Sequence, residues 1–82
     1  MYTLHIENND VYAVIKALKI DDTLDHLHFF AKDPSYDLTV EDTETGEVVF
    51  WHAPYAEYGD DDYYITREFL WMKRGWDLTY DS

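Results

Sequence analysis

Hydrophobic and polar residues alternate at both ends of the chain, and a period of two is typical of β-strands with one buried face. In residues 2–6 this alternation places three apolar side chains on one face: Tyr2, Leu4 and Ile6. Residues 76–80 repeat the pattern with Trp76, Leu78 and Tyr80. We therefore predict that both segments are strands.

Two further strands are predicted in the middle of the chain. Residues 36–41 alternate cleanly, and residues 47–52 are rich in the residue types that strands favour. Gly46 stands between them, and a glycine there can supply the positive φ that follows a type I turn. Together these features predict a β-hairpin over residues 36–52.

Two segments have the spacing of short helices. Apolar residues recur at intervals of three and four over residues 10–20, which predicts a helix with Asn8 or Asn9 as its N-cap. The recurring residues are Val11, Val14, Ile15 and Leu18. Residues 22–31 favour a second helix with a restart cap at Asp22 and Asp25, although the alternation in residues 26–29 fits a strand almost as well. Pro34 should end this segment, because the residue before a proline avoids helical geometry.

A third helix is predicted over residues 60–76, with a signal at each end. Asp60, Asp61 and Asp62 stand where a helix presents unpaired N–H groups and the positive end of its dipole. Lys73, Arg74 and Gly75 have the pattern of a last turn and its cap. The stripe expected to face the core contains Ile65, Phe69 and Met72, and Trp71 lies outside it.

The predicted order of elements is β-α-(α)-β-β-α-β, within a chain of 82 residues, which is long enough for one domain. We therefore expect a small α+β domain in which an antiparallel sheet of about four strands carries two or three helices on one face.

The charge is far from balanced: 18 carboxylates face six lysines and arginines, for a formal net charge of −12. Disorder is one explanation of such a balance, but the hydrophobic content of 46% and its clear periodicity argue against it. A generic solvated surface and halophilic adaptation remain as explanations. Direct binding of nucleic acid is disfavoured, because a polyanion requires the opposite charge. Without an export signal or a long apolar segment, a cytoplasmic location is expected.

Candidate catalytic and metal-binding residues are sparse. The chain has no cysteine, which excludes disulfides and thiolate ligands. His26 and His28 would point apart on a helix, and Asp22 with His26 supplies only two ligands at helical spacing. The aspartates at 60–62 lack the spaced oxygen ligands of a calcium loop. We therefore expect no metal, no cofactor and no catalytic activity.

An interaction protein is the interpretation that uses the charge. Carboxylates in the hairpin loop, the turn at 21–25 and the loop at 57–62 could form a band that competes with nucleic acid for a basic groove, and exposed aromatic residues, Tyr55 among them, could anchor it. The expected partner is a basic, nucleic-acid-binding protein, as for phage anti-restriction or anti-CRISPR inhibitors. An immunity protein, an antitoxin or an adaptor is the alternative, beside an acidic domain with no specific use for its charge. The expected partner-binding residues are Asp21, Asp22, Asp25, Glu41, Asp42, Glu44, Glu47, Glu57, Tyr58, Asp60, Asp61, Asp62, Tyr63, Tyr64 and Trp71.

Overall fold

The computed structural model describes the backbone of residues 1–81 and the side chains of residues 1–74. Within this part of the chain, five strands and two helices follow one another in the order β-β-α-β-β-β-α. They are β1 (Tyr2–Glu7), β2 (Tyr12–Leu18), α1 (Ile20–Phe30), β3 (Asp37–Asp42), β4 (Val48–His52), β5 (Tyr63–Ile65) and α2 (Arg67–Asp81).

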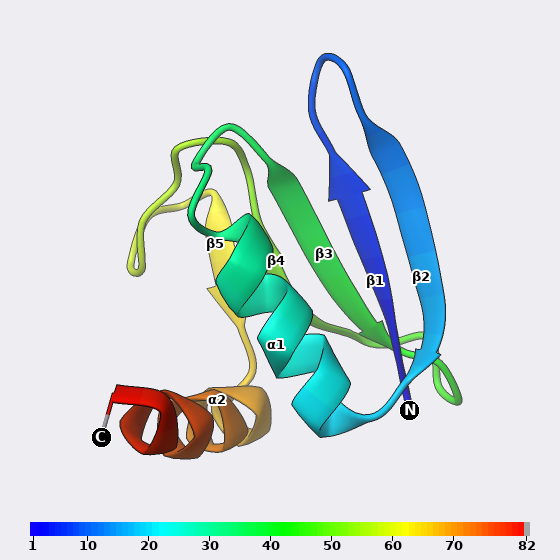
Figure 1. Ribbon diagram of the computed structural model, residues 1–82, viewed down its shortest axis with the longest axis vertical. Helices are drawn as coiled ribbons and strands as arrows, with labels where there is room; N and C mark the ends of the chain where they lie inside the picture. Colours follow the sequence, from blue (N-terminus) through cyan, green and yellow to red (C-terminus); the bar gives the residue numbers. More distant parts are fainter. Residues whose placement is uncertain (82) are drawn as a thin grey trace.

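All five strands belong to one sheet, with the spatial order β2-β1-β3-β4-β5 and antiparallel pairing between all neighbours. α1 lies across one face of this sheet, and α2 packs beside it at the end where β5 finishes (Figure 1). The predicted α+β class with a single antiparallel sheet is therefore confirmed, with five strands in place of about four. Among the described residues, no helix has both the length and the apolar character that crossing a bilayer requires.

The core lies between the helices and one face of the sheet. β1 contributes Leu4 and Ile6, with 0% and 1% of their surface exposed, as the alternation of the first strand predicts. The other members of the core come from both helices and from β3 and β4: Leu24, Leu27, Leu38, Val40, Phe50 and Phe69. In the part of the chain that the structure describes, the opposite face of the sheet carries no helix, and we call it the open face.

The β3–β4 hairpin also forms as predicted. The Asp42 backbone N–H donates to the Glu47 carbonyl at 2.8 Å, and the Gly46 N–H donates to the Asp42 carbonyl at 2.8 Å. The Asp42 carboxylate accepts bonds from the backbone N–H groups of Glu44 and Thr45 at 2.8 and 3.3 Å. Gly46 has φ of 74°, the left-handed conformation predicted for it.

We expect Gly46→Val to lower the free energy of unfolding by about 1–2 kcal/mol, because a β-branched residue is strained at positive φ. Apart from Gly46 and its two chain neighbours, no described atom lies within 4 Å of the position that a Cβ would occupy, so the loss comes from backbone strain. Gly46→Asn is the control, since asparagine tolerates this conformation better. Chemical denaturation of both variants checks the prediction, and equal stability of the valine variant and the wild type would contradict it.

The predicted helix over residues 10–20 is wrong, because this segment forms strand β2. Asn8 stabilises a turn instead of capping a helix: its side-chain oxygen accepts bonds from the N–H groups of Asp10 and Val11 at 2.9 and 2.7 Å. The chain then runs back along β1, with Ile15 opposite Leu4. Burial against the core thus outweighs the helical spacing of the apolar residues.

The helix preferred for residues 22–31 is confirmed as α1, but the predicted restart cap is wrong. α1 begins at Ile20, and its N-cap residue Lys19 makes no side-chain capping bond. Asp22 and Asp25 therefore lie inside the helix. The buried Thr23 hydroxyl donates to the Lys19 carbonyl at 2.8 Å, which ties the first turn to the end of the preceding chain.

The predicted helix over residues 60–76 is confirmed only over residues 67–76, and the predicted strand over 76–80 is wrong. Asp60, Asp61 and Asp62 lie in the β4–β5 loop, and residues 63–65 form strand β5 because they pair with residues 50–52 of β4. The helix begins about two turns later than predicted, at Arg67, where the Thr66 hydroxyl accepts a bond from the Phe69 N–H at 3.2 Å. α2 then continues to Asp81, so that Gly75 lies inside the helix and caps nothing.

Candidate partner-binding surface

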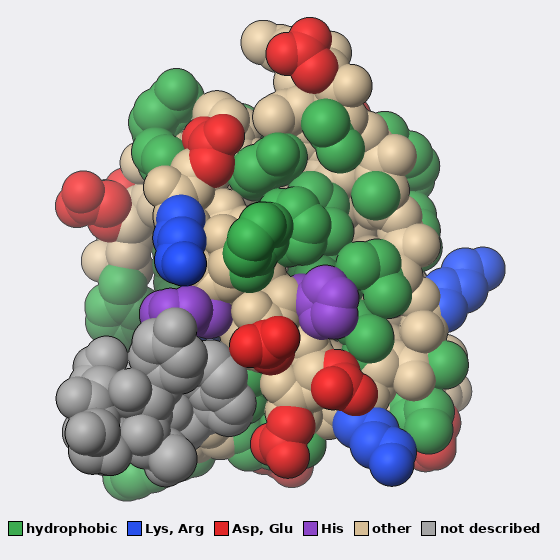
Figure 2. Space-filling view, viewed as in Figure 1, with side chains coloured by type: hydrophobic (Ala, Val, Ile, Leu, Met, Phe, Trp, Pro, Cys, Tyr) green, Lys and Arg blue, Asp and Glu red, His purple; other side chains and the backbone are tan. Residues whose placement is uncertain are grey.

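The acidic loops lie at two opposite ends of the sheet. What we call the upper end comprises the β1–β2 turn (residues 8–11), the α1–β3 connection (residues 31–36) and the β4–β5 loop (residues 53–62). The lower end comprises the β3–β4 loop (residues 43–47) and the starts of α1 and α2 (Figure 1). Figure 2 likewise shows carboxylates toward both ends of the helix-bearing face, with hydrophobic side chains between them.

The structure divides the predicted band of carboxylates between these ends. Glu57, Asp60, Asp61 and Asp62 lie at the upper end, and the remaining predicted acidic residues lie at or near the lower end. These are Asp21, Asp22, Asp25, Glu41, Asp42, Glu44 and Glu47. The two groups are thus separated by the length of the strands and do not form one continuous cluster.

The β4–β5 loop is held in a folded shape by its own hydrogen bonds. The Ala53 N–H donates to the Asp62 carbonyl at 2.9 Å and closes the base of the loop. The Glu57 N–H donates to the Asp60 carboxylate at 2.9 Å, and Gly59 turns the chain with φ of 96°. Because the backbone is fixed in this way, the exposed carboxylates of the loop are presented in a defined arrangement.

This loop also contacts the other segments of the upper end. The Tyr55 N–H donates to the Pro34 carbonyl at 2.7 Å, and Tyr55 itself has the unusual φ of 64°. Beside it lies a shallow hollow of about 230 Å³, which the β1–β2 turn borders on the other side. The residues that line the hollow are Asn8, Asn9, Asp10, Ser35, Pro54 and Tyr55.

The chemistry of this hollow suits a cationic side chain. Asp10 provides a carboxylate, the Asn9 amide provides an acceptor oxygen, and the Tyr55 ring, 71% exposed, provides a face for a guanidinium or ammonium group. Beside the hollow, the Ser35 N–H donates to the Asp33 carboxylate at 3.0 Å and lowers the pKa of Asp33, which keeps this group ionised. The three upper-end segments contain six carboxylates and a single cationic residue, Lys32.

The predicted aromatic anchors differ in how they are placed. Tyr58 and Trp71 are exposed by 64% and 68%, so both are accessible, but Trp71 lies on α2 and not with the loop. Tyr63 is half-buried, with its ring centroid 5.5 Å from Phe50 and 5.6 Å from Tyr58. Tyr63 therefore packs against Tyr58 and exposes little of its own surface to a partner.

Tyr64 belongs to the open face of the sheet, where it pairs with Trp51 of β4. A row of cross-strand partners runs over this face, with Val14, His5 and Thr39 continuing it toward β2. Two carboxylates border the row and are already engaged. The Trp51 indole donates to Asp37 at 3.1 Å, and His5 Nε2 lies 3.1 Å from Glu41 Oε1. The predicted residues Glu41 and Tyr64 thus lie on this face and not in the loops.

At the lower end, Asp42, Glu47 and Glu68 border a hollow of about 100 Å³ together with Tyr2. Burial raises the pKa of the Tyr2 hydroxyl, and the charges of Asp42 and Glu68 raise it further. No group of three potential ligands among the described residues could hold a metal ion. His26, considered as a ligand from the sequence, bonds the Asp22 carbonyl through Nδ1 at 2.7 Å.

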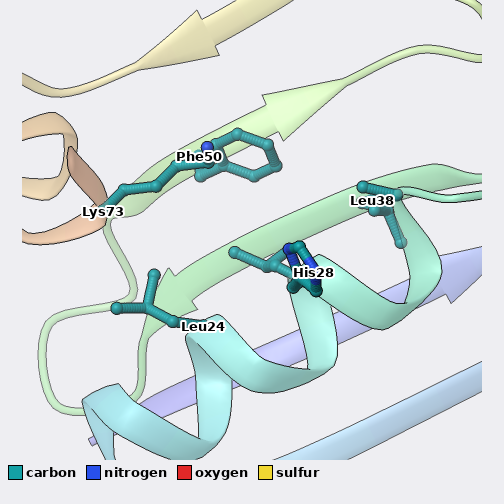
Figure 3. A pocket seen from close by; sticks show the side chains of 7 residues that line it. Leu24, His28, Leu38, Phe50 and Lys73 are labelled. Atoms are coloured by element: carbon teal, nitrogen blue, oxygen red, sulfur yellow. The ribbon is translucent and has the colours of Figure 1, made fainter. Parts of the chain in front are cut away.

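A small cavity of about 80 Å³ lies where α1, α2 and the sheet meet (Figure 3). Its walls are mostly apolar, with Leu24 and Leu27 on α1, Leu38 and Phe50 on the sheet, and Lys73 of α2 at its border. A cavity of this size and lining belongs to the packing of the core and not to the surface that would meet a macromolecule.

The part of the upper end that the β1–β2 turn supplies is not predicted by the sequence pattern. Asn8 and Asn9 were assigned to a helix N-cap, and Asp10 to the helix itself, so that none was placed near Tyr55. The signal that could have located them is the run Asn8-Asn9-Asp10 between two segments rich in β-branched residues, which is also typical of a hairpin turn.

Comparison of the chain with protein families, with curated proteins and with solved structures gives no match.

Proposed function

We propose that this protein binds a basic protein partner through its upper end and blocks the nucleic-acid-binding groove of that partner. The observation that carries the proposal is the composition of this surface: six carboxylates and the exposed rings of Tyr55 and Tyr58 beside a single lysine. Such an activity is that of the phage anti-restriction and anti-CRISPR class of inhibitors, acting in the cytoplasm as a binding protein and not as an enzyme.

The hollow beside Tyr55 supports this proposal by giving an arginine or lysine of the partner a defined place. A guanidinium group stacked on the Tyr55 ring would lie beside Asp10, which combines a cation–aromatic contact with an ion pair. The carboxylates of the folded loop would then face the surrounding basic surface. Attraction between opposite charges speeds encounter, and the tyrosines provide contact area that salt does not screen.

The separation of the carboxylates favours a second form of the same activity. An extended imitation of duplex DNA requires charge along the whole contact, whereas here the two acidic groups lie at opposite ends of the strands. A contact restricted to the upper end is small and local. It is equally suited to an immunity protein, an antitoxin or an adaptor that covers one basic patch of its partner.

Replacing Asp60, Asp61 and Asp62 together by asparagine is expected to slow association with a basic partner by about tenfold, because three charges that steer the encounter are lost. Asparagine keeps the size of each side chain and an oxygen that can accept the Glu57 N–H bond. The measurement is the rate of association with an arginine-rich peptide at low and high salt, with and without duplex oligonucleotide. The same measurement applies to a partner protein once one has been isolated by affinity capture on this protein.

The matched control neutralises three carboxylates at the lower end, as Asp21→Asn, Asp22→Asn and Glu44→Gln. Both triple variants have the same net charge, so a difference between them reports the position of the charge. Equal slowing by the two variants would contradict a binding site at the upper end. Simultaneous binding of oligonucleotide and protein to the partner would refute the inhibitory form and leave the immunity or adaptor form.

A further inference from the structure

β2 forms one edge of the sheet, and its outer side pairs with no strand among the described residues. Its regular part is short and has defined limits. The β1–β2 turn precedes Tyr12, and an irregularity at Ala17, with φ of 59°, follows Lys16. Residues 12–16 are therefore the stretch that another strand could join, because a bulge disrupts the hydrogen-bond ladder.

The side chains of this stretch are complementary to a second copy of themselves. In an antiparallel pair related by a two-fold axis at Val14, Tyr12 lies opposite Lys16 of the second copy, and Ala13 lies opposite Ile15. Tyr12 and Lys16 are both exposed and both on the open face, as their alternation with Ile15 requires. Directly opposed side chains in a sheet are close enough to interact, so each lysine would contact a tyrosine ring.

The other face of β2 offers an apolar surface at the same edge. A groove of about 460 Å³ lies between β2 and α1. It is bordered by three apolar residues, Ile15, Phe29 and Phe30, and by Asp25, His26, His28 and Lys32. Phe29 is 65% exposed, although its ring meets Phe30 edge-on at 5.2 Å. α1 lies in front of β3 and β4, and leaves β2 uncovered (Figure 1). The two-fold axis would join the grooves of both copies into one trough, in which Phe29 becomes covered.

The charge distribution selects a second copy over a basic partner at this edge. Three of the six lysines and arginines of the chain lie at this edge: Lys16 on β2, Lys19 just after it, and Lys32 beside the groove, which Asp25 also borders. Antiparallel pairing would also bring the Lys19 end of one β2 beside the Asp10 end of the other. In a chain of net charge −12, two copies repel each other least where the local charge is most nearly balanced.

We propose that the protein forms a symmetric dimer by pairing of the β2 edges about Val14, which extends the two sheets into one. The proposal does not depend on the function assigned to the upper end. Unlike binding to a basic partner, dimerisation should strengthen as salt rises, because salt screens the repulsion between two highly negative bodies.

The test is analytical ultracentrifugation of the full chain over a wide range of protein concentration at two salt concentrations. The wild type is expected to shift from monomer to dimer, more readily at high salt. Lys16→Glu and Tyr12→Lys, each acting twice in a symmetric dimer, are each expected to raise the dimer dissociation constant about tenfold. The double variant Tyr12→Lys with Lys16→Glu restores opposite partners across the pair and is expected to recover most of the affinity.

Arg67→Glu is the matched control, because it makes the same change of charge as Lys16→Glu but lies at the start of α2, away from the edge. Circular dichroism of each variant confirms that the fold is kept. A chain that stays monomeric at all concentrations, or a dimer equally sensitive to Arg67→Glu and Lys16→Glu, would overturn the proposal. If both single variants dimerise more weakly and the double variant does not recover the dimer affinity, the register about Val14 is wrong, and the proposed dimer is overturned.

Discussion

Phe69→Ala is expected to lower the free energy of unfolding by about 3–5 kcal/mol, which is the range for truncating a buried phenylalanine. Phe69 is 1% exposed and is a buried member of the core on α2, where Met72 also packs against the core. Its ring centroid lies 5.8 Å from that of Tyr2 and 6.0 Å from that of Phe50. Truncation would leave both rings beside a cavity and would weaken the attachment of α2 to the sheet.

Small domains have a total stability of about 5–15 kcal/mol, so the Phe69 variant should be partly or wholly unfolded at moderate temperature. Trp71→Ala is the control, because Trp71 lies two residues along the same helix and is 68% exposed. We expect its stability to change by less than about 0.5 kcal/mol, as for other surface substitutions. The measurement is thermal and urea unfolding of both variants. Similar losses of stability in the two variants would mean that α2 packs against the sheet through a different face.

The position of Phe69 in the core was predictable although the helix that carries it was wrongly bounded. Spacing of three and four residues identifies the buried side of a helix wherever the helix begins. The starting point is harder to locate, because Asp60 and Thr66 are both acceptable capping residues. Pairing of residues 63–65 with β4 decides between them, and such long-range pairing leaves no mark in the local sequence.

Strand β2 shows even more clearly that local spacing alone does not determine which element forms. Val11, Val14, Ile15 and Leu18 have the spacing of a helix, but only Ile15 and Leu18 pack against the core. The irregularity at Ala17 brings Leu18 opposite Tyr2 and thereby breaks the period of two that would have identified a strand. By contrast, β1 and the β3–β4 hairpin have uninterrupted alternation or a glycine at the turn, and their prediction is confirmed.

For the candidate surface, composition was predictable, and placement was predictable only in part. The acidic and aromatic character of residues 57–62 follows from the sequence directly. Their separation from residues 41–47 follows from strand β4, which connects the two loops and therefore places them at opposite ends of the sheet. The approach of Tyr55 to Asp10 joins residues 45 positions apart, and only the order β1-β3-β4 brings those two loops to one end.

Leu38→Ala is expected to cost about 3–5 kcal/mol, in the upper part of the range for buried leucines. Leu38 is fully buried in β3, between Ile6 of β1 and His52 of β4. It also borders the cavity between α1, α2 and the sheet (Figure 3). The volume lost with the side chain would add to a cavity that already measures about 80 Å³, and the cost of truncation rises with the volume of the cavity that remains.

Leu38→Met is the matched control, because methionine nearly conserves the volume and should cost less than about 1.5 kcal/mol. The measurement is the free energy of unfolding in urea for both variants, with the slope against denaturant compared to confirm that the unfolding transition keeps its cooperativity. A loss below about 1 kcal/mol in the alanine variant would mean that α1 moves toward the sheet and fills the space. In that case α1 can shift relative to the sheet at this cavity, and Leu38 fixes the position of α1 less firmly than its complete burial implies.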